Sequence, residues 1–133
     1  MMQENVRVVV AELCDGERYL ITQRSEGSLF GGMWEFPGGR VRSGETDQEA
    51  LSRALLDRLG ASVDVGACLD ESRHNYAPHH ITLAVYQCTL RDTPRAVRVA
   101  ALAWVTVEEL DSYSFPPADA ASIARLLGED SEG

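Results

Sequence analysis

The sequence predicts a single α+β domain, in which helices pack on the faces of a mixed sheet. Three observations lead to this prediction. The chain has 133 residues, of which 44% are apolar and 25% charged, and this is the size and composition of one globular domain with its own core. Short β-branched and aromatic runs, separated by turn signals, fill most of its length. One long segment has helical apolar spacing instead, which gives the order β-β-β-α-β-β-β-α.

The stretch at residues 34–61 contains the main helix. It opens with W-E-F-P-G-G, which is typical of a short strand entering a tight glycine loop. A helix is predicted at residues 46–59 because the sequence supplies a capping box, apolar residues at every fourth position and a glycine at the C-terminal cap. These residues are Thr46 with Glu49, then Leu51, Leu55 and Leu59, and finally Gly60.

A glycine loop that feeds a helix is a plausible site for a phosphate group or for the metal that accompanies it. Glu45, Arg53 and Asp57 are the charged residues beside this loop. The alternative is an ordinary helix with a solvated polar face. In that case Glu45 is a solvated loop acid, and Arg53 pairs with Glu49 or Asp57 at helical spacing.

The remaining elements follow from the same patterns. A polar loop is expected at residues 71–79, where His74, Tyr76 and Pro78 lie, and one helical turn at 107–110. Prolines 116 and 117 precede a short helix at 118–127. We expect residues 1–128 to form the domain and residues 129–133 a flexible acidic tail. The predicted strands are residues 6–14, 18–24, 34–37, 62–70, 80–90 and 97–107.

Composition excludes several classes of protein. The formal net charge of −9 argues against a general nucleic-acid binder, which usually presents a basic face. No apolar run approaches membrane-spanning length, and no secretory signal begins the chain. The cysteines are Cys14, Cys68 and Cys88, an odd number without a C-x-x-C pair. They are expected to be buried, reduced thiols of a cytoplasmic protein.

The stretch at residues 34–61 resembles the Nudix box, G-x5-E-x7-R-E-U-x-E-E-x-G-U, where U is a bulky apolar residue. The residues in register are Gly39, Glu45, Arg53, Leu55 and Gly60. The W-E-F-P-G-G run is similar to the MutT-like branch of that superfamily. Beyond the box, the resemblance extends to H-H-I-T-L at 79–83, Trp104 and F-P-P-A-D at 115–119. It implies the α/β/α sandwich of the Nudix fold.

The resemblance also implies an activity. Nudix enzymes hydrolyse a nucleoside diphosphate linked to a further group, usually with Mg²⁺ or Mn²⁺, and their box carboxylates and a glycine carbonyl ligate the metal. By this resemblance Glu45 and Arg53 are catalytic, and Asp57 and the Gly38 carbonyl bind metal. Ala54 and Arg58 stand where the family has two further carboxylates. A surface acid remains the alternative for Asp57.

Five residues are expected to bind substrate. By resemblance Arg24 and Phe36 line the nucleobase pocket, His79 reaches the nucleotide, and Asp119 reads the edge of the base. In the alternative, Phe36 is a core residue, His79 is an ordinary loop histidine, and Asp119 is an acid at the start of a helix. Arg58 is able to hold a phosphate directly, since guanidinium matches phosphate oxygens in bidentate fashion.

Two functions from different classes follow. The first is a MutT-like nucleotide pyrophosphohydrolase with weak or altered activity, which uses Mg²⁺ or Mn²⁺. The second is a non-catalytic nucleotide-binding or sensor module that has lost the metal site and needs no metal. Both readings expect a small-molecule nucleotide as the partner, with no membrane and no general nucleic-acid binding, and both leave a homodimer open.

Overall fold

The computed structural model describes residues 4–27, 30–76 and 79–116, without the side chains of residues 4, 76 and 79. Three predictions therefore lie outside the described residues: the helix at 118–127, the tail at 129–133 and the role of Asp119. The elements are β1 (Glu4–Asp15), β2 (Arg18–Gln23), β3 (Trp34–Glu35), β4 (Gly38–Arg40), α1 (Asp47–Leu59), β5 (Val63–Tyr76), β6 (His79–Leu90), β7 (Ala101–Thr106) and the 3₁₀ helix η1 (Glu108–Ser112).

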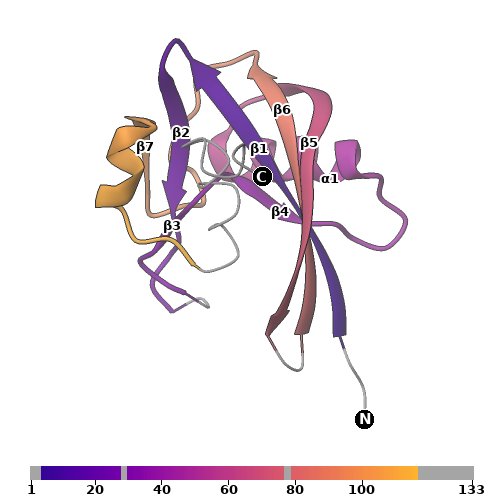
Figure 1. Cartoon of the computed structure of the whole chain (residues 1–133). Coiled ribbons are helices and arrows are strands. Elements are labelled where there is room, and N and C mark those ends of the chain that lie inside the picture. Colours follow the sequence, from indigo (N-terminus) through magenta and orange to yellow (C-terminus); the bar gives the residue numbers. More distant parts are fainter. Residues whose placement is uncertain (1–3, 28–29, 77–78, 117–133) are drawn as a thin grey trace.

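Within the described part of the chain, seven strands form one mixed sheet. Its central order is β3-β2-β1-β6-β5, with β4 paired to β1 and β7 paired to β2. β1 and β6 run parallel from the pair Glu4–His79 to the pair Leu13–Cys88, and the other pairings are antiparallel. Figure 1 shows β1, β6 and β5 side by side as a long ribbon. The mixed sheet with its helix confirms the predicted α+β class.

Both faces of the central part of β1 are buried, since its alternate residues face opposite sides and join different core clusters. Val9, Ala11 and Leu13 pack with the helix residues Leu51 and Leu55 in one core cluster. Their neighbour Val10 belongs to a second cluster on the other face, which includes Leu110 of η1. In Figure 1, α1 and η1 accordingly lie on opposite sides of the central strands. The strand and helix patterns of the sequence therefore converge on two apolar layers.

Helix α1 begins and ends as the sequence predicts. Thr46 is the N-cap, and its hydroxyl accepts a hydrogen bond from the Glu49 backbone N–H at 3.1 Å. The Glu49 carboxylate in turn accepts from the Thr46 backbone N–H at 2.9 Å. Gly60 ends the helix with φ 62°, a left-handed conformation that glycine adopts without strain. The predicted capping box and glycine cap are confirmed.

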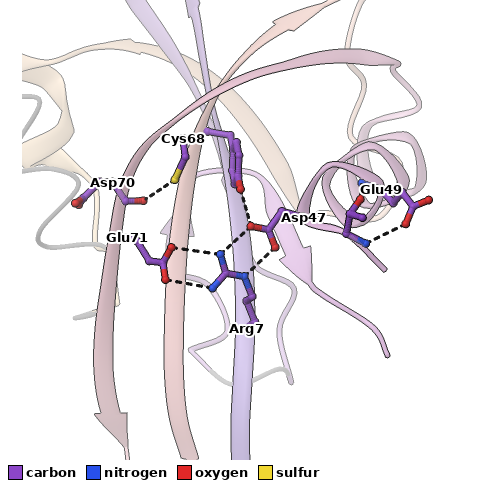
Figure 2. A network of polar contacts seen from close by, with 8 residues as sticks. Arg7, Asp47, Glu49, Cys68, Asp70 and Glu71 are labelled. Carbon is purple, nitrogen blue, oxygen red and sulfur yellow. Dashed lines mark hydrogen bonds and ion pairs between the residues drawn. The ribbon is translucent and has the colours of Figure 1, made fainter. Parts of the chain in front are cut away.

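A polar network anchors the start of α1 to the sheet (Figure 2). Arg7 of β1 donates two hydrogen bonds to the Asp47 carboxylate, at 2.8 and 2.7 Å. The Tyr86 hydroxyl donates to the same carboxylate at 2.6 Å, and Arg7 also reaches Glu71 of β5 at 3.3 Å. Arg7 lowers the pKa of Asp47, while the Asp47 carboxylate raises the pKa of Tyr86 to about 12. The helix N-terminus is therefore fixed to three strands.

The prediction of a polar loop at residues 71–79 is wrong, because most of this segment belongs to a strand. β5 continues to Tyr76, and its pairs with β6 include Ser72–Leu83 and His74–Ile81. Polar composition misled the prediction because β5 is at the edge of the sheet, where side chains face water while the backbone pairs normally. The pairing shifts between Val65 and Asp70, which marks an irregularity typical of an edge strand.

The strand predicted at residues 97–107 is shorter than expected. β7 starts only at Ala101, because the preceding segment bonds to the end of α1 instead of to a strand. The backbone N–H groups of Arg95, Val97 and Arg98 donate to the carbonyls of Leu59 and Arg58 at 2.8–3.0 Å. These carbonyls lack partners inside the helix, so the segment at 95–98 satisfies the C-terminus of α1. The predicted helical turn at 107–110 is present as η1.

The expectation of three buried thiols is wrong for two of them. Cys14 lies where β1 enters the hairpin and Cys68 lies at the irregular edge of β5, and both are exposed. Only Cys88 is buried, and this burial raises its pKa to about 11. All three are free cysteines, as expected. None of the helices among the described residues has both the length and the apolar character needed to cross a membrane.

Two neighbouring leucines of α1 test this packing with the same chemical change. Leu55 is fully buried, whereas Leu56 is 57% exposed. Leu55→Ala should lower the free energy of unfolding by roughly 2–5 kcal/mol, since it removes core contacts and leaves a cavity. Leu56→Ala should change it by about 0.5 kcal/mol or less. Urea denaturation of both variants measures the difference, and equal losses would contradict the placement of the helix.

Candidate functional site: an arginine-rich pocket beside helix α1

The glycine pair of β4 positions the site. A Cβ atom at Gly38 would overlap the carbonyl oxygen of Val9, so only glycine allows β4 to approach β1 this closely. A Cβ atom at Gly39 would lie 2.9 Å from the Ala54 Cβ atom of α1 and 3.7 Å from the Arg58 Nη2 atom. The helix therefore packs directly on β4, and the Arg58 guanidinium lies over Gly39.

Glu45 and Arg53 form a bidentate ion pair. Arg53 donates from Nε to Glu45 Oε2 at 2.6 Å and from Nη2 to Oε1 at 2.9 Å. Arg53 Nη2 also donates to the Arg40 carbonyl at 2.8 Å, and the Arg42 backbone N–H donates to Glu45 at 2.8 Å. Arg53 thus fixes the loop between β4 and α1. The alternative in which Arg53 pairs with Glu49 or Asp57 is therefore wrong. The alternative in which Glu45 is a solvated loop acid is also wrong, since its side chain is paired and only 19% exposed.

This pairing sets the chemistry of Glu45. The hydrogen bonds from Arg53 and from the Arg42 backbone lower the pKa of Glu45 to about 2. A carboxylate with so low a pKa holds a proton too weakly to serve as an efficient general base near neutral pH. In this arrangement Glu45 orders the loop, and its catalytic role stays a prediction.

A pocket of about 250 Å³ opens between α1, β3 and the segment before β7. Its lining residues are Arg24, Ser25, Glu35, Asp57, Arg58, Arg98 and Val99. Three of the nine residues predicted for the site, Arg24, Asp57 and Arg58, are therefore brought together here. Arg24 Nη1 donates to Glu35 Oε1 at 2.8 Å, and Arg58 Nη1 lies 4.0 Å from the other oxygen of that carboxylate. Glu35 is thus flanked by two arginines.

Asp57 faces a third arginine. Arg98 Nε lies 2.9 Å from Asp57 Oδ1, with side chains that are 69% and 52% exposed respectively. The sequence analysis did not predict a role for Arg98, which lies outside the box, in a segment expected to be a strand. The available signal was R-A-V-R at 95–98, two arginines inside an apolar run. Their hydrogen bonds to the end of α1 bring Arg98 beside the box residues.

The residues present do not fit a dedicated Mg²⁺ site. Among the described residues, no group of three or more histidine, cysteine or acidic side chains could hold a metal ion. Ala54 is 1% exposed and offers no ligand. Asp57 is paired with Arg98, and Arg58 adds a positive charge next to it. Mg²⁺ requires several hard oxygen ligands, and adjacent guanidinium groups repel it. The metal-binding roles of Asp57 and Gly38 stay predictions.

The other predicted binding residues lie elsewhere. Phe36 is 2% exposed, packs in the second core cluster, and has its ring centroid 5.9 Å from that of Phe115. It is not among the residues that line the pocket. His79 opens β6 opposite Tyr76, but its side chain is outside the described residues, as is all of Asp119. The roles of these three residues in substrate binding stay predictions.

The Glu45–Arg53 pair should be visible in the acid range. Since the folded-state pKa of Glu45 is lowered from 4.5 to about 2, ionised Glu45 stabilises the fold above pH 4.5. This contribution should disappear as the pH falls through about 2. Wild type should therefore exceed Glu45→Gln in urea midpoint at pH 6, and the difference should shrink towards pH 2.

A carboxyl NMR titration provides the control for this prediction. Arg53→Gln should return the Glu45 pKa towards its usual value. Arg91→Gln, which removes an arginine paired with Asp64 instead, should leave the Glu45 pKa unchanged. A constant difference in midpoint at all pH values would show that Glu45 is not held in this ion pair.

Comparison with known sequences finds the same family over most of the chain. The model of the NUDIX domain matches residues 8–125. A Mycobacterium tuberculosis protein provisionally named 8-oxo-dGTP diphosphatase 2 is 38% identical over 124 residues, which is 92% of this chain and 88% of the relative. The CTP pyrophosphohydrolase of Escherichia coli K12 is 31% identical over 115 residues, with 86% and 85% of the two chains covered.

The fold agrees with a solved structure of a Nudix hydrolase. The solution structure of the DNA mismatch repair protein MutT, a Nudix hydrolase from methicillin-resistant Staphylococcus aureus 252, superposes with a TM-score of 0.76 at 31% identity. The match covers 96% of this chain and 99% of that one. The α/β/α sandwich implied by the box resemblance is confirmed. The chain belongs to the Nudix superfamily, in its MutT-like branch of nucleotide pyrophosphohydrolases.

Proposed function

We propose that this chain binds a nucleoside di- or triphosphate in the arginine-rich pocket and hydrolyses it only weakly by the metal-dependent route. The names of its relatives support the ligand class, since 8-oxo-dGTP and CTP are both nucleoside triphosphates. The observation that supports weak activity is the presence of Ala54 and Arg58 in the box. These residues occupy the positions of two family carboxylates, and Arg58 lines the pocket as a cation.

The electrostatics of the described site support the same proposal. Hydrolysis of a pyrophosphate bond requires neutralisation of the phosphates and a base that activates water. Glu45, with a pKa of about 2, is a weak base, and Asp57 already has Arg98 as its partner. The pocket therefore retains groups that attract phosphate, whereas the box positions among the described residues offer no free carboxylate to activate water. Arg24 also lines the pocket and adds a further positive charge.

A second function, a nucleotide sensor without catalysis, is supported by the same pairs. In this alternative Glu45 and Asp57 are purely structural, and binding itself is the activity. Both functions predict that a nucleoside triphosphate raises the melting temperature, because a ligand of the folded state stabilises it by mass action. They differ only in turnover, so the decisive measurement is phosphate or pyrophosphate release from a nucleotide panel with Mg²⁺ or Mn²⁺.

A variant that restores the box calibrates this measurement. Ala54→Glu/Arg58→Glu returns two carboxylates next to Asp57. A positioned base contributes roughly 10²–10⁴-fold to a rate, so the double variant should exceed wild type by about that factor. Asp57→Asn added to the double variant should remove the gain, which ties it to the restored site. Wild-type turnover in the ordinary range, roughly 1–10³ s⁻¹, would contradict the proposal of weak activity.

A further inference from the structure

The guanidinium group of Arg58 has unused hydrogen-bond donors that face the pocket. Among the described residues its side chain makes one polar contact, the 4.0 Å ion pair with Glu35. That separation is too long for a hydrogen bond, whereas Arg24 already binds the same carboxylate at 2.8 Å. An arginine carries five N–H donors, and the Arg58 side chain is 36% exposed at the pocket wall. The need to neutralise the Glu35 carboxylate therefore does not explain why the Arg58 guanidinium lies at the pocket wall.

Arg98 adds a second group of the same kind. Its Nε atom lies 2.9 Å from Asp57 Oδ1, and its side chain is 69% exposed. The Arg98 backbone N–H donates to the Arg58 carbonyl at 2.9 Å. Arg58 and Arg98, which both line the pocket, are therefore held together through the main chain. The Arg58 and Arg98 side chains can thus approach one ligand from two separate segments.

The balance of charge favours an anion over a cation. Arg24, Arg58 and Arg98 outnumber Glu35 and Asp57, so the lining carries one net positive charge in a chain whose total is −9. Guanidinium groups bind phosphate oxygens in bidentate fashion and stay protonated at all physiological pH values. The same charges disfavour Mg²⁺, and the part of the chain that the structure describes holds no group of three or more histidine, cysteine or acidic side chains able to bind a metal ion.

We propose that Arg58 and Arg98 bind the phosphate groups of the nucleotide directly, so that the pocket takes the metal-free polyphosphate instead of its Mg²⁺ complex. This inference rests on the proposed function and specifies its ligand. Arg98 exchanges Asp57 for the phosphate, and Arg58 uses donors that are already available. Mg²⁺ then competes with the arginines for the same phosphate oxygens. Excess Mg²⁺ should weaken binding, which is the reverse of a metal-assembled site.

Calorimetric titration of the 133-residue chain tests this directly. The ligands are inorganic pyrophosphate and CTP, each with EDTA and with excess Mg²⁺. Wild type should bind more tightly in EDTA. Arg58→Gln and Arg98→Gln should each weaken binding in EDTA by about tenfold to a hundredfold, since each removes a charge-assisted pair. Arg91→Gln is the matched control, because it also removes one arginine paired with an aspartate but lies outside the pocket lining.

Three results separate the two proposals. CTP binding in EDTA that is unaffected by Arg58→Gln and Arg98→Gln overturns the inference and leaves the proposed function intact. Binding by wild type that requires Mg²⁺ also overturns the inference alone. No binding of CTP, dGTP or 8-oxo-dGTP in either condition overturns the proposed function. Arg98 is largely exposed, so Arg98→Gln remains informative if Arg58→Gln disturbs the helix.

Discussion

The close approach of β4 to its neighbours is the constraint on which the site depends. Gly38 lies against the β1 backbone and Gly39 against Ala54, so a side chain at either position would force β4 away from the sheet or from α1. The helix therefore presents Ala54 to β4 and turns Asp57 and Arg58 towards the pocket. Close packing tolerates little adjustment at such contacts. The geometry of the pocket follows from backbone packing before any charged group contributes.

Arginine–carboxylate pairs then order the segments around α1. The exposure of their side chains indicates how strongly each pair stabilises its segment. The Arg53–Glu45 pair has side chains that are 28% and 19% exposed and two short hydrogen bonds, so it holds the loop before the helix firmly. The Arg98–Asp57 pair, at 69% and 52%, is a surface pair of small net stability. The difference matters for the proposed binding of phosphate. A phosphate can replace Asp57 as the partner of Arg98 without unfolding the surrounding segments.

Sequence patterns predicted the elements whose signals are local. The capping box, the leucine spacing and Gly60 define α1 because each acts within a few residues. The strand character of residues 71–76 was missed because pairing with β6 is a long-range interaction that exposed polar residues do not reveal. Arg98 was missed for a related reason: its position depends on hydrogen bonds to the carbonyl of Arg58, forty residues away. Motif spacing identified Asp57 and Arg58, but it could not show which arginine faces Asp57.

Packing and chemistry are separable in this box because different faces of one helix carry them. Leu51, Leu55 and Leu59 are buried against the sheet, while Asp57 and Arg58 remain accessible on the pocket side. Replacing a carboxylate by Arg58 therefore leaves the core untouched and inverts the charge offered to a ligand. The fold persists because the buried contacts persist, and the ligand preference changes because the phosphate-facing charge has changed. For this reason the family of the chain establishes its architecture, whereas its activity has to be argued from Ala54, Arg58 and Arg98.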